Sequence, residues 1–64
     1  MEFRECLECL TKECELMIGR FPKLCLDIAK EDIKTLWICA YTECARGDQI
    51  KEEAMKEDCA NLCR

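Results

Sequence analysis

Histidine, serine and valine are all missing from this 64-residue sequence. Without histidine or serine, Ser-His and Cys-His catalytic pairs are excluded within the chain, and so are zinc sites that need histidine. Without valine, and with few other β-branched residues, β-strands are disfavoured. The sequence therefore indicates an all-helical protein that lacks the common catalytic pairs.

A long hydrophobic run is also missing. The longest apolar segment covers only residues 36–41, far below the ~20 residues that a membrane span requires. Basic residues are outnumbered by acidic ones, 10 against 14, which gives a net charge of −4. A nucleic-acid-binding protein would carry a basic stripe, and adsorption to an anionic membrane also needs positive charge. We expect neither partner.

Cysteine is the residue type present in excess, since it fills eight of the 64 positions. That share is above the ~8–10% that marks a disulfide scaffold in a short secreted chain. A chain of this size has a core worth only about 3–5 kcal/mol, and each disulfide adds about 2–4 kcal/mol. We expect residues 1–64 to form a single domain, cross-linked through all of its cysteines: Cys6, Cys9, Cys14, Cys25, Cys39, Cys44, Cys59 and Cys63.

The cellular compartment is indicated by two features that disagree. Even cysteine parity favours secretion. The charged residues 1–5 are unlike a secretory signal, so an initiator Met1 favours the cytoplasm. We expect a mature secreted domain with an added Met1, and an intracellular thiolate protein is the alternative.

Gly19, Pro22 and Gly47 divide the sequence into three helical segments, at 2–18, 22–46 and 48–63. Gly19 suits the left-handed residue that ends a helix, Pro22 suits a helix start, and Asp48 suits an N-cap. Short connections between three helices predict an up-down-up bundle. The middle segment would be ~37 Å long as one helix, so a break between Lys30 and Asp32 is the alternative.

In an up-down-up bundle the first and third helices run parallel, which allows two disulfides between them. Two cross-links would join these helices, Cys6–Cys59 and Cys9–Cys63. The turn around Gly19 would place Cys14 beside Cys25. Cys39 and Cys44 remain, and their five-residue offset is poor for a mutual bond on a straight helix. Either the helix bends there or each cysteine pairs elsewhere.

Metal binding is the alternative use of the cysteines, because thiolates suit Cu(I), zinc or iron–sulfur clusters. The Cys59-x3-Cys63 spacing resembles the CxxxC helices of the cysteine-rich four-helix copper-storage proteins, over residues 48–63. This resemblance implies that Cys59 and Cys63 would bind Cu(I) as thiolates. A redox-active dithiol at Cys6-x2-Cys9 is disfavoured, because nearby glutamates raise thiol pKa values.

An acidic, disulfide-stapled bundle of three helices is similar to the secreted mating pheromones of ciliates, and in kind to small helical venom toxins. This similarity implies a ligand that recognises a protein receptor or channel, with no catalysis and no cofactor. Cu(I) or zinc would be the cofactor of the alternative thiolate protein. The sequence leaves the oligomeric state open.

Candidate binding residues lie in and after the middle segment. Ile38 falls opposite the apolar stripe, and with Tyr41 it forms a candidate contact patch. Arg46 and Asp48 flank Gly47 in a triplet that matches the integrin-binding tripeptide. Trp37 is expected in the core, and Gly47 and Asp48 also suit a helix stop followed by an N-cap.

Overall fold

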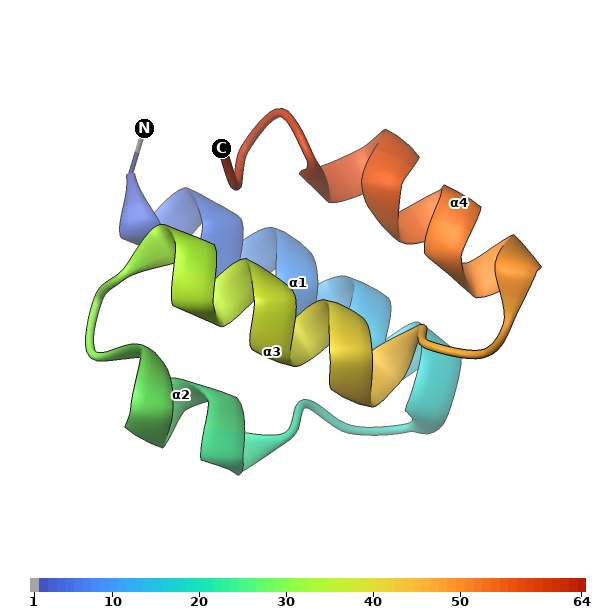
Figure 1. The fold of residues 1–64 in the computed structure, drawn as a ribbon, viewed down its shortest axis with the longest axis horizontal. Helices are drawn as coiled ribbons and strands as arrows, with labels where there is room; N and C mark the ends of the chain where they lie inside the picture. Colours follow the sequence, from blue (N-terminus) through green and yellow to red (C-terminus); the bar gives the residue numbers. More distant parts are fainter. Residues whose placement is uncertain (1) are drawn as a thin grey trace.

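The computed structural model describes residues 2–64 as four α-helices joined by short connections: α1 (Phe3–Ile18), α2 (Lys23–Ala29), α3 (Ile33–Cys44) and α4 (Gln49–Cys59). These residues include no strand. The helices form a body of 27 × 22 × 16 Å. Successive helices reverse direction, so that the start of α1 lies near the end of the chain (Figure 1). The all-helical, disulfide-stapled fold that the composition predicts is confirmed.

The predicted three-helix, up-down-up arrangement needs one correction. The middle segment is two helices, because the chain breaks between Ala29 and Ile33, where the alternative prediction places the break. Lys30 and Glu31 both have positive φ angles, 48° and 71°, and these end α2. The Asp32 carboxylate then accepts hydrogen bonds from Lys34 N and Thr35 Oγ1 and starts α3. The extra reversal turns up-down-up into up-down-up-down.

The helix ends near Gly19 and Gly47 lie close to the positions that the sequence predicts. Gly19 takes a left-handed φ of 86°, and its N–H donates to the Glu15 carbonyl oxygen at 3.0 Å. Asp48 is the N-cap of α4 and accepts hydrogen bonds from Ile50 N and Lys51 N. Pro22 lies one position before α2 rather than at its first residue. These signals work because each satisfies backbone groups that a helix end leaves free.

The core is small and rich in sulfur. Within residues 2–64, half of the twelve buried hydrophobic residues are cysteines, and the large apolar side chains other than cysteine that are fully buried are only Leu10, Leu36 and Met55. Helix α3 packs against each of the other three helices, whereas α2 packs against α3 alone among the helices of residues 2–64. The disulfides are therefore part of the packing as well as cross-links.

No helix within residues 2–64 combines the length and the apolar character that crossing a bilayer demands.

Candidate functional site

All eight cysteines are oxidised in four disulfides, and none is free. The pairs are Cys6–Cys63, Cys9–Cys59, Cys14–Cys44 and Cys25–Cys39, with Cα–Cα distances of 4.9, 5.8, 5.3 and 5.5 Å. Each bond lies within the sequence interval closed by the one before it, so the four are nested. The innermost bond spans 14 residues and the outermost spans 57.

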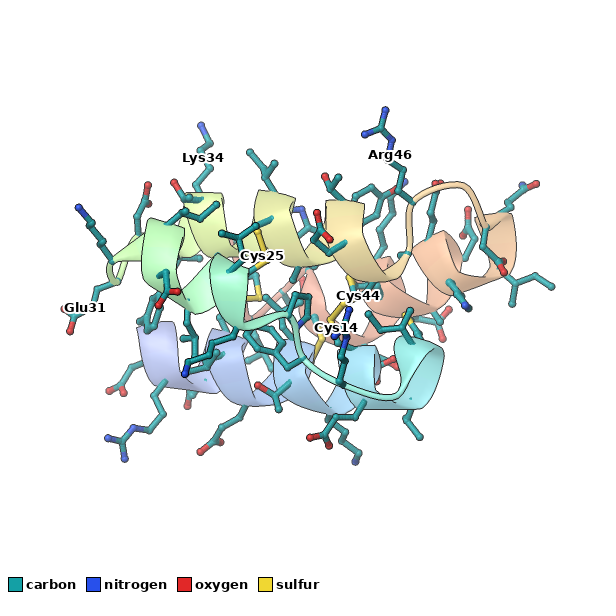
Figure 2. The ribbon with its side chains drawn as sticks, turned by 90° about the horizontal axis from the view of Figure 1, so that it is seen from below. Cys14, Cys25, Glu31, Lys34, Cys44 and Arg46 are labelled. Carbon is teal, nitrogen blue, oxygen red and sulfur yellow. A yellow bond between two sulfur atoms is a disulfide. The ribbon has the colours of Figure 1, made fainter. Side chains whose placement is uncertain are left out.

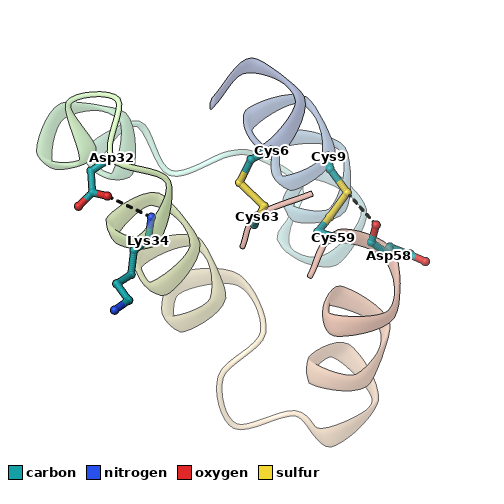
Figure 3. The surroundings of a disulfide bond; sticks show 7 residues. All are labelled: Cys6, Cys9, Asp32, Lys34, Asp58, Cys59 and Cys63. Carbon is teal, nitrogen blue, oxygen red and sulfur yellow. Dashed lines mark hydrogen bonds between the residues drawn. A yellow bond between two sulfur atoms is a disulfide. The ribbon is translucent and has the colours of Figure 1, made fainter. Parts of the chain in front are cut away.

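The expected Cys6–Cys59 and Cys9–Cys63 bonds are wrong in order but right in the elements that they join. The structure pairs Cys6 with Cys63 and Cys9 with Cys59, side by side across α1 and the end of the chain (Figure 3). The physical reason is the break after Ala29. The extra reversal makes α4 antiparallel to α1, which exchanges the two partners.

The expected Cys14–Cys25 bond is also wrong. Cys14 pairs with Cys44 between α1 and α3 (Figure 2), and Cys25 pairs with Cys39 between α2 and α3. Cys39 and Cys44 therefore bond to two different helices, as their five-residue offset on α3 requires. The turn at Gly19 does bring α2 back along the molecule, but α3 lies beside α1 and provides the partner of Cys14.

The oxidised cysteines offer no thiolate for a metal. Cys59 and Cys63, the candidate Cu(I) ligands, are each bonded to a cysteine of α1. No group of three or more cysteine or acidic side chains within residues 2–64 is arranged to hold a metal ion. The disulfides therefore do not favour the metal-binding alternative.

Not all of the disulfides are equally enclosed. Cys6 and Cys14 are fully buried and their partners nearly so, whereas Cys9 and Cys39 are half-buried. The Cys9 Sγ atom lies 3.3 Å from the Asp58 carbonyl oxygen (Figure 3), a contact in which the bonded sulfur has no proton to donate. Cys39 instead borders an open depression between α2 and α3.

This depression has a volume of about 300 Å³, and Cys39 of the Cys25–Cys39 bond lies in its lining. We call it the α2–α3 depression. Ile38, a candidate binding residue, is in its lining and is 55% exposed. The lining residues are Leu24, Ile28, Thr35, Ile38, Cys39, Thr42 and Glu43. The two aliphatic side chains that α2 contributes were not predicted as binding residues, although their i, i+4 spacing places them on one helix face.

Tyr41, unlike Ile38, is not in the lining of the α2–α3 depression. The Tyr41 ring stacks on Trp37 with 5.6 Å between ring centroids, and the Lys56 ammonium lies 5.7 Å from the Tyr41 centroid. Both aromatic side chains are half-buried and pack against the core. The two residues of the candidate patch are therefore not brought together in one depression.

Arg46, Gly47 and Asp48 lie exposed in the connection between α3 and α4. The Arg46 side chain extends outward on the same side of α3 as Lys34 (Figure 2). The Asp48 carboxylate, however, accepts the two backbone hydrogen bonds that cap α4, and Gly47 N donates to Glu52 Oε2 at 3.1 Å. The carboxylate that an adhesion motif would present is thus engaged in helix capping.

One acidic side chain within residues 2–64 is buried. Glu13 on α1 is only 8% exposed. Burial raises the pKa of its carboxyl group above the usual value, and the nearby Asp58 carboxyl raises that pKa further, against a smaller lowering by Lys12. The pair joins α1 to α4 beside the Cys9–Cys59 bond and makes this contact sensitive to pH.

Comparison of the chain with family models, with curated proteins and with solved structures found no match.

Proposed function

We propose that this chain is a secreted, disulfide-stapled helical protein that acts without catalysis, by surface recognition of a protein receptor or channel. The observation that carries the proposal is the oxidation of all eight cysteines in four disulfides. Disulfides persist in extracellular compartments and are rare in the reducing cytosol. A small core supported by nested cross-links is typical of secreted domains of this size.

The part of the surface best suited to recognition is the α2–α3 depression. Its rim carries three exposed aliphatic side chains, Leu24, Ile28 and Ile38. A volume of about 300 Å³ is at the lower end of what small-molecule pockets provide. An open depression of this size accommodates an aliphatic side chain of a receptor, and that is the occupant we propose.

The oxidised state is tested on protein from its natural source, with free thiols blocked by an alkylating agent at the moment of lysis or collection. We expect no alkylated cysteine before reduction and eight after it. Free thiols in freshly collected, folded material would contradict the proposal, and a bound metal in that material would favour the thiolate alternative.

The recognition surface is tested by saturable binding of the labelled protein to intact cells of its source. Ile38→Asp is expected to weaken this binding by about tenfold or more, because a charge replaces an apolar contact. Ile50→Asp is the matched control: Ile50 is 81% exposed on α4 and lies outside the depression. Equal effects of the two substitutions would exclude the depression as the recognition surface.

A further inference from the structure

We infer that the Cys25–Cys39 disulfide is a redox-modification site, which a dithiol reductant opens before the other three bonds and whose opening releases α2. The inference rests on the proposed function and extends it to regulation, because Cys39 of this bond lines the depression proposed for recognition. Three observations support it: the packing of α2, the number of its covalent tethers, and the position of Cys39.

Helix α2 is short and packs against a single neighbour, α3. It is seven residues long, and its buried side chains are only Cys25 and Ala29. Its helix-to-helix contacts within the described chain are with α3 alone. Three of its aliphatic side chains, Leu24, Leu26 and Ile28, are between 40% and 57% exposed. Because two buried side chains and one packing partner hold α2, we expect it to separate from α3 at a lower free energy than global unfolding requires.

The Cys25–Cys39 bond is the only covalent link between α2 and another helix. Helix α1, in contrast, is joined to the end of the chain by two bonds, Cys6–Cys63 and Cys9–Cys59. Breaking Cys9–Cys59 therefore leaves a second cross-link close by. Breaking Cys25–Cys39 leaves α2 covalently attached only through its flanking backbone. We therefore expect loss of this bond to free its helix more than loss of Cys9–Cys59 would free α1.

Access for a reductant is from the side of Cys39. This residue is half-buried and borders the α2–α3 depression, whereas Cys25 is fully buried. A thiolate of the reductant attacks Cys39 Sγ, a mixed disulfide forms, and Cys25 leaves as a thiolate that takes up a proton. The second thiol of the reductant then attacks the mixed disulfide, so that Cys39 is released as a thiol and the reductant is oxidised by two electrons.

Opening this bond removes one wall of the depression. Leu24 and Ile28 are contributed by α2, while Thr35, Ile38 and Thr42 are contributed by α3. When α2 detaches, the two groups of side chains no longer face one another, and the recognition surface is lost while the other three disulfides still join α1, α3 and the end of the chain.

The test is partial reduction of the oxidised protein with graded low concentrations of dithiothreitol, followed by thiol blocking and peptide mapping. We expect Cys25 and Cys39 to be labelled first, about tenfold faster than the other six cysteines, because local opening of α2 exposes their bond. Earlier labelling of Cys9 and Cys59, or simultaneous labelling of all eight, would overturn the inference.

A pair of double variants provides the second measurement. Removing the bond with Cys25→Ala and Cys39→Ala is expected to abolish amide hydrogen-exchange protection in α2 and to retain it in α1 and α3. The matched control, Cys9→Ala with Cys59→Ala, also removes a bond with one half-buried cysteine and should leave α2 protected. Persistent protection of α2 without the Cys25–Cys39 bond would contradict the inference. If the variant that lacks this bond does not fold, the order of thiol labelling in the partial reduction is the test.

The two proposals fail separately. The order of labelling is measured on purified protein and does not depend on where the protein acts or what it binds. Free thiols in natural material would remove the proposed function and leave the labelling order intact, while a different labelling order would remove only the redox control.

Discussion

Glu13 is the one charged side chain within residues 2–64 that is buried. Its raised pKa makes the stability of the molecule depend on pH. Its pKa in the folded state is raised above 4.5, first by burial and then by Asp58. A raised pKa means that the folded state binds the proton more tightly than the unfolded state does. The stabilisation that this proton provides is complete below pH 4.5 and is lost as the pH rises through the folded pKa.

Glu13→Gln is accordingly expected to raise the melting temperature at pH 7 and to reduce its dependence on pH above 4.5, because a neutral amide replaces a buried carboxylate. The measurement is thermal unfolding across a pH series. Glu15→Gln, an exposed change on the same helix, is the control and should leave the pH profile close to that of the unaltered chain. An identical response of both variants would refute the role of Glu13.

Asp48 is the second informative residue, because its carboxylate caps α4 and is also part of the triplet that matches the integrin-binding tripeptide. Its side chain accepts hydrogen bonds from Ile50 N and Lys51 N at 3.0 and 3.2 Å. Asp48→Ala should lower the free energy of unfolding by about 1 kcal/mol, as loss of an N-cap does, measured by urea titration of the oxidised protein. Arg46→Ala, an exposed change two residues away, should have little effect. Equal stability of all three chains would show that capping contributes nothing.

At the scale of the elements, the connection between α2 and α3 decides the topology. Lys30 and Glu31 adopt left-handed backbone conformations that non-glycine residues rarely take. Such a conformation costs about 1–2 kcal/mol per residue. Packing of α2 on α3 and the Cys25–Cys39 bond offset this strain.

Glu31→Gly is therefore expected to raise the free energy of unfolding by roughly 0.5–1 kcal/mol, because glycine takes positive φ without steric strain. Denaturant unfolding of the oxidised protein measures the change. Glu53→Gly, in the exposed middle of α4, is the control and should lower stability by about 1 kcal/mol. A destabilising effect at both positions would mean that the backbone at Glu31 is not strained.

At the scale of the whole molecule, the cysteines that form the cross-links also make up much of the packed core. Among the residues that the structure describes, six of the twelve buried hydrophobic ones are cysteines, and the large apolar side chains other than cysteine that are fully buried number only three, Leu10, Leu36 and Met55. Closed alone, loops of 14 and 57 residues would contribute roughly 3 and 4 kcal/mol. The nested bonds share parts of their loops, so their total contribution is smaller than the sum of four separate loops.

Complete reduction without denaturant is expected to abolish most of the helical far-UV circular dichroism at 25 °C, because the remaining core is too small to offset chain entropy. Reoxidation should restore the signal. A fully reduced chain that still melts cooperatively would contradict this account of stability, and alkylation of the reduced sample before measurement controls for incomplete reduction.

The local features of the fold were predictable from the sequence. Helix formers predict the helices, Gly19 predicts the end of α1, and Asp48 predicts the start of α4, because each depends on groups within a few residues. The number of cysteines and the small size of the chain likewise predict cross-linking. All of these properties are set by composition or by neighbours along the chain.

Only the tertiary structure decided which cysteines pair and which face carries a depression. No glycine or proline marks the reversal at Lys30 and Glu31, so the sequence left the middle segment open as one helix or two. That single reversal sets the direction of α4, exchanges the partners of Cys6 and Cys9, and brings Leu24 and Ile28 beside Ile38. Pairing and surface shape depend on how helices lie relative to one another in space, and long-range packing fixes that arrangement where local backbone preference does not.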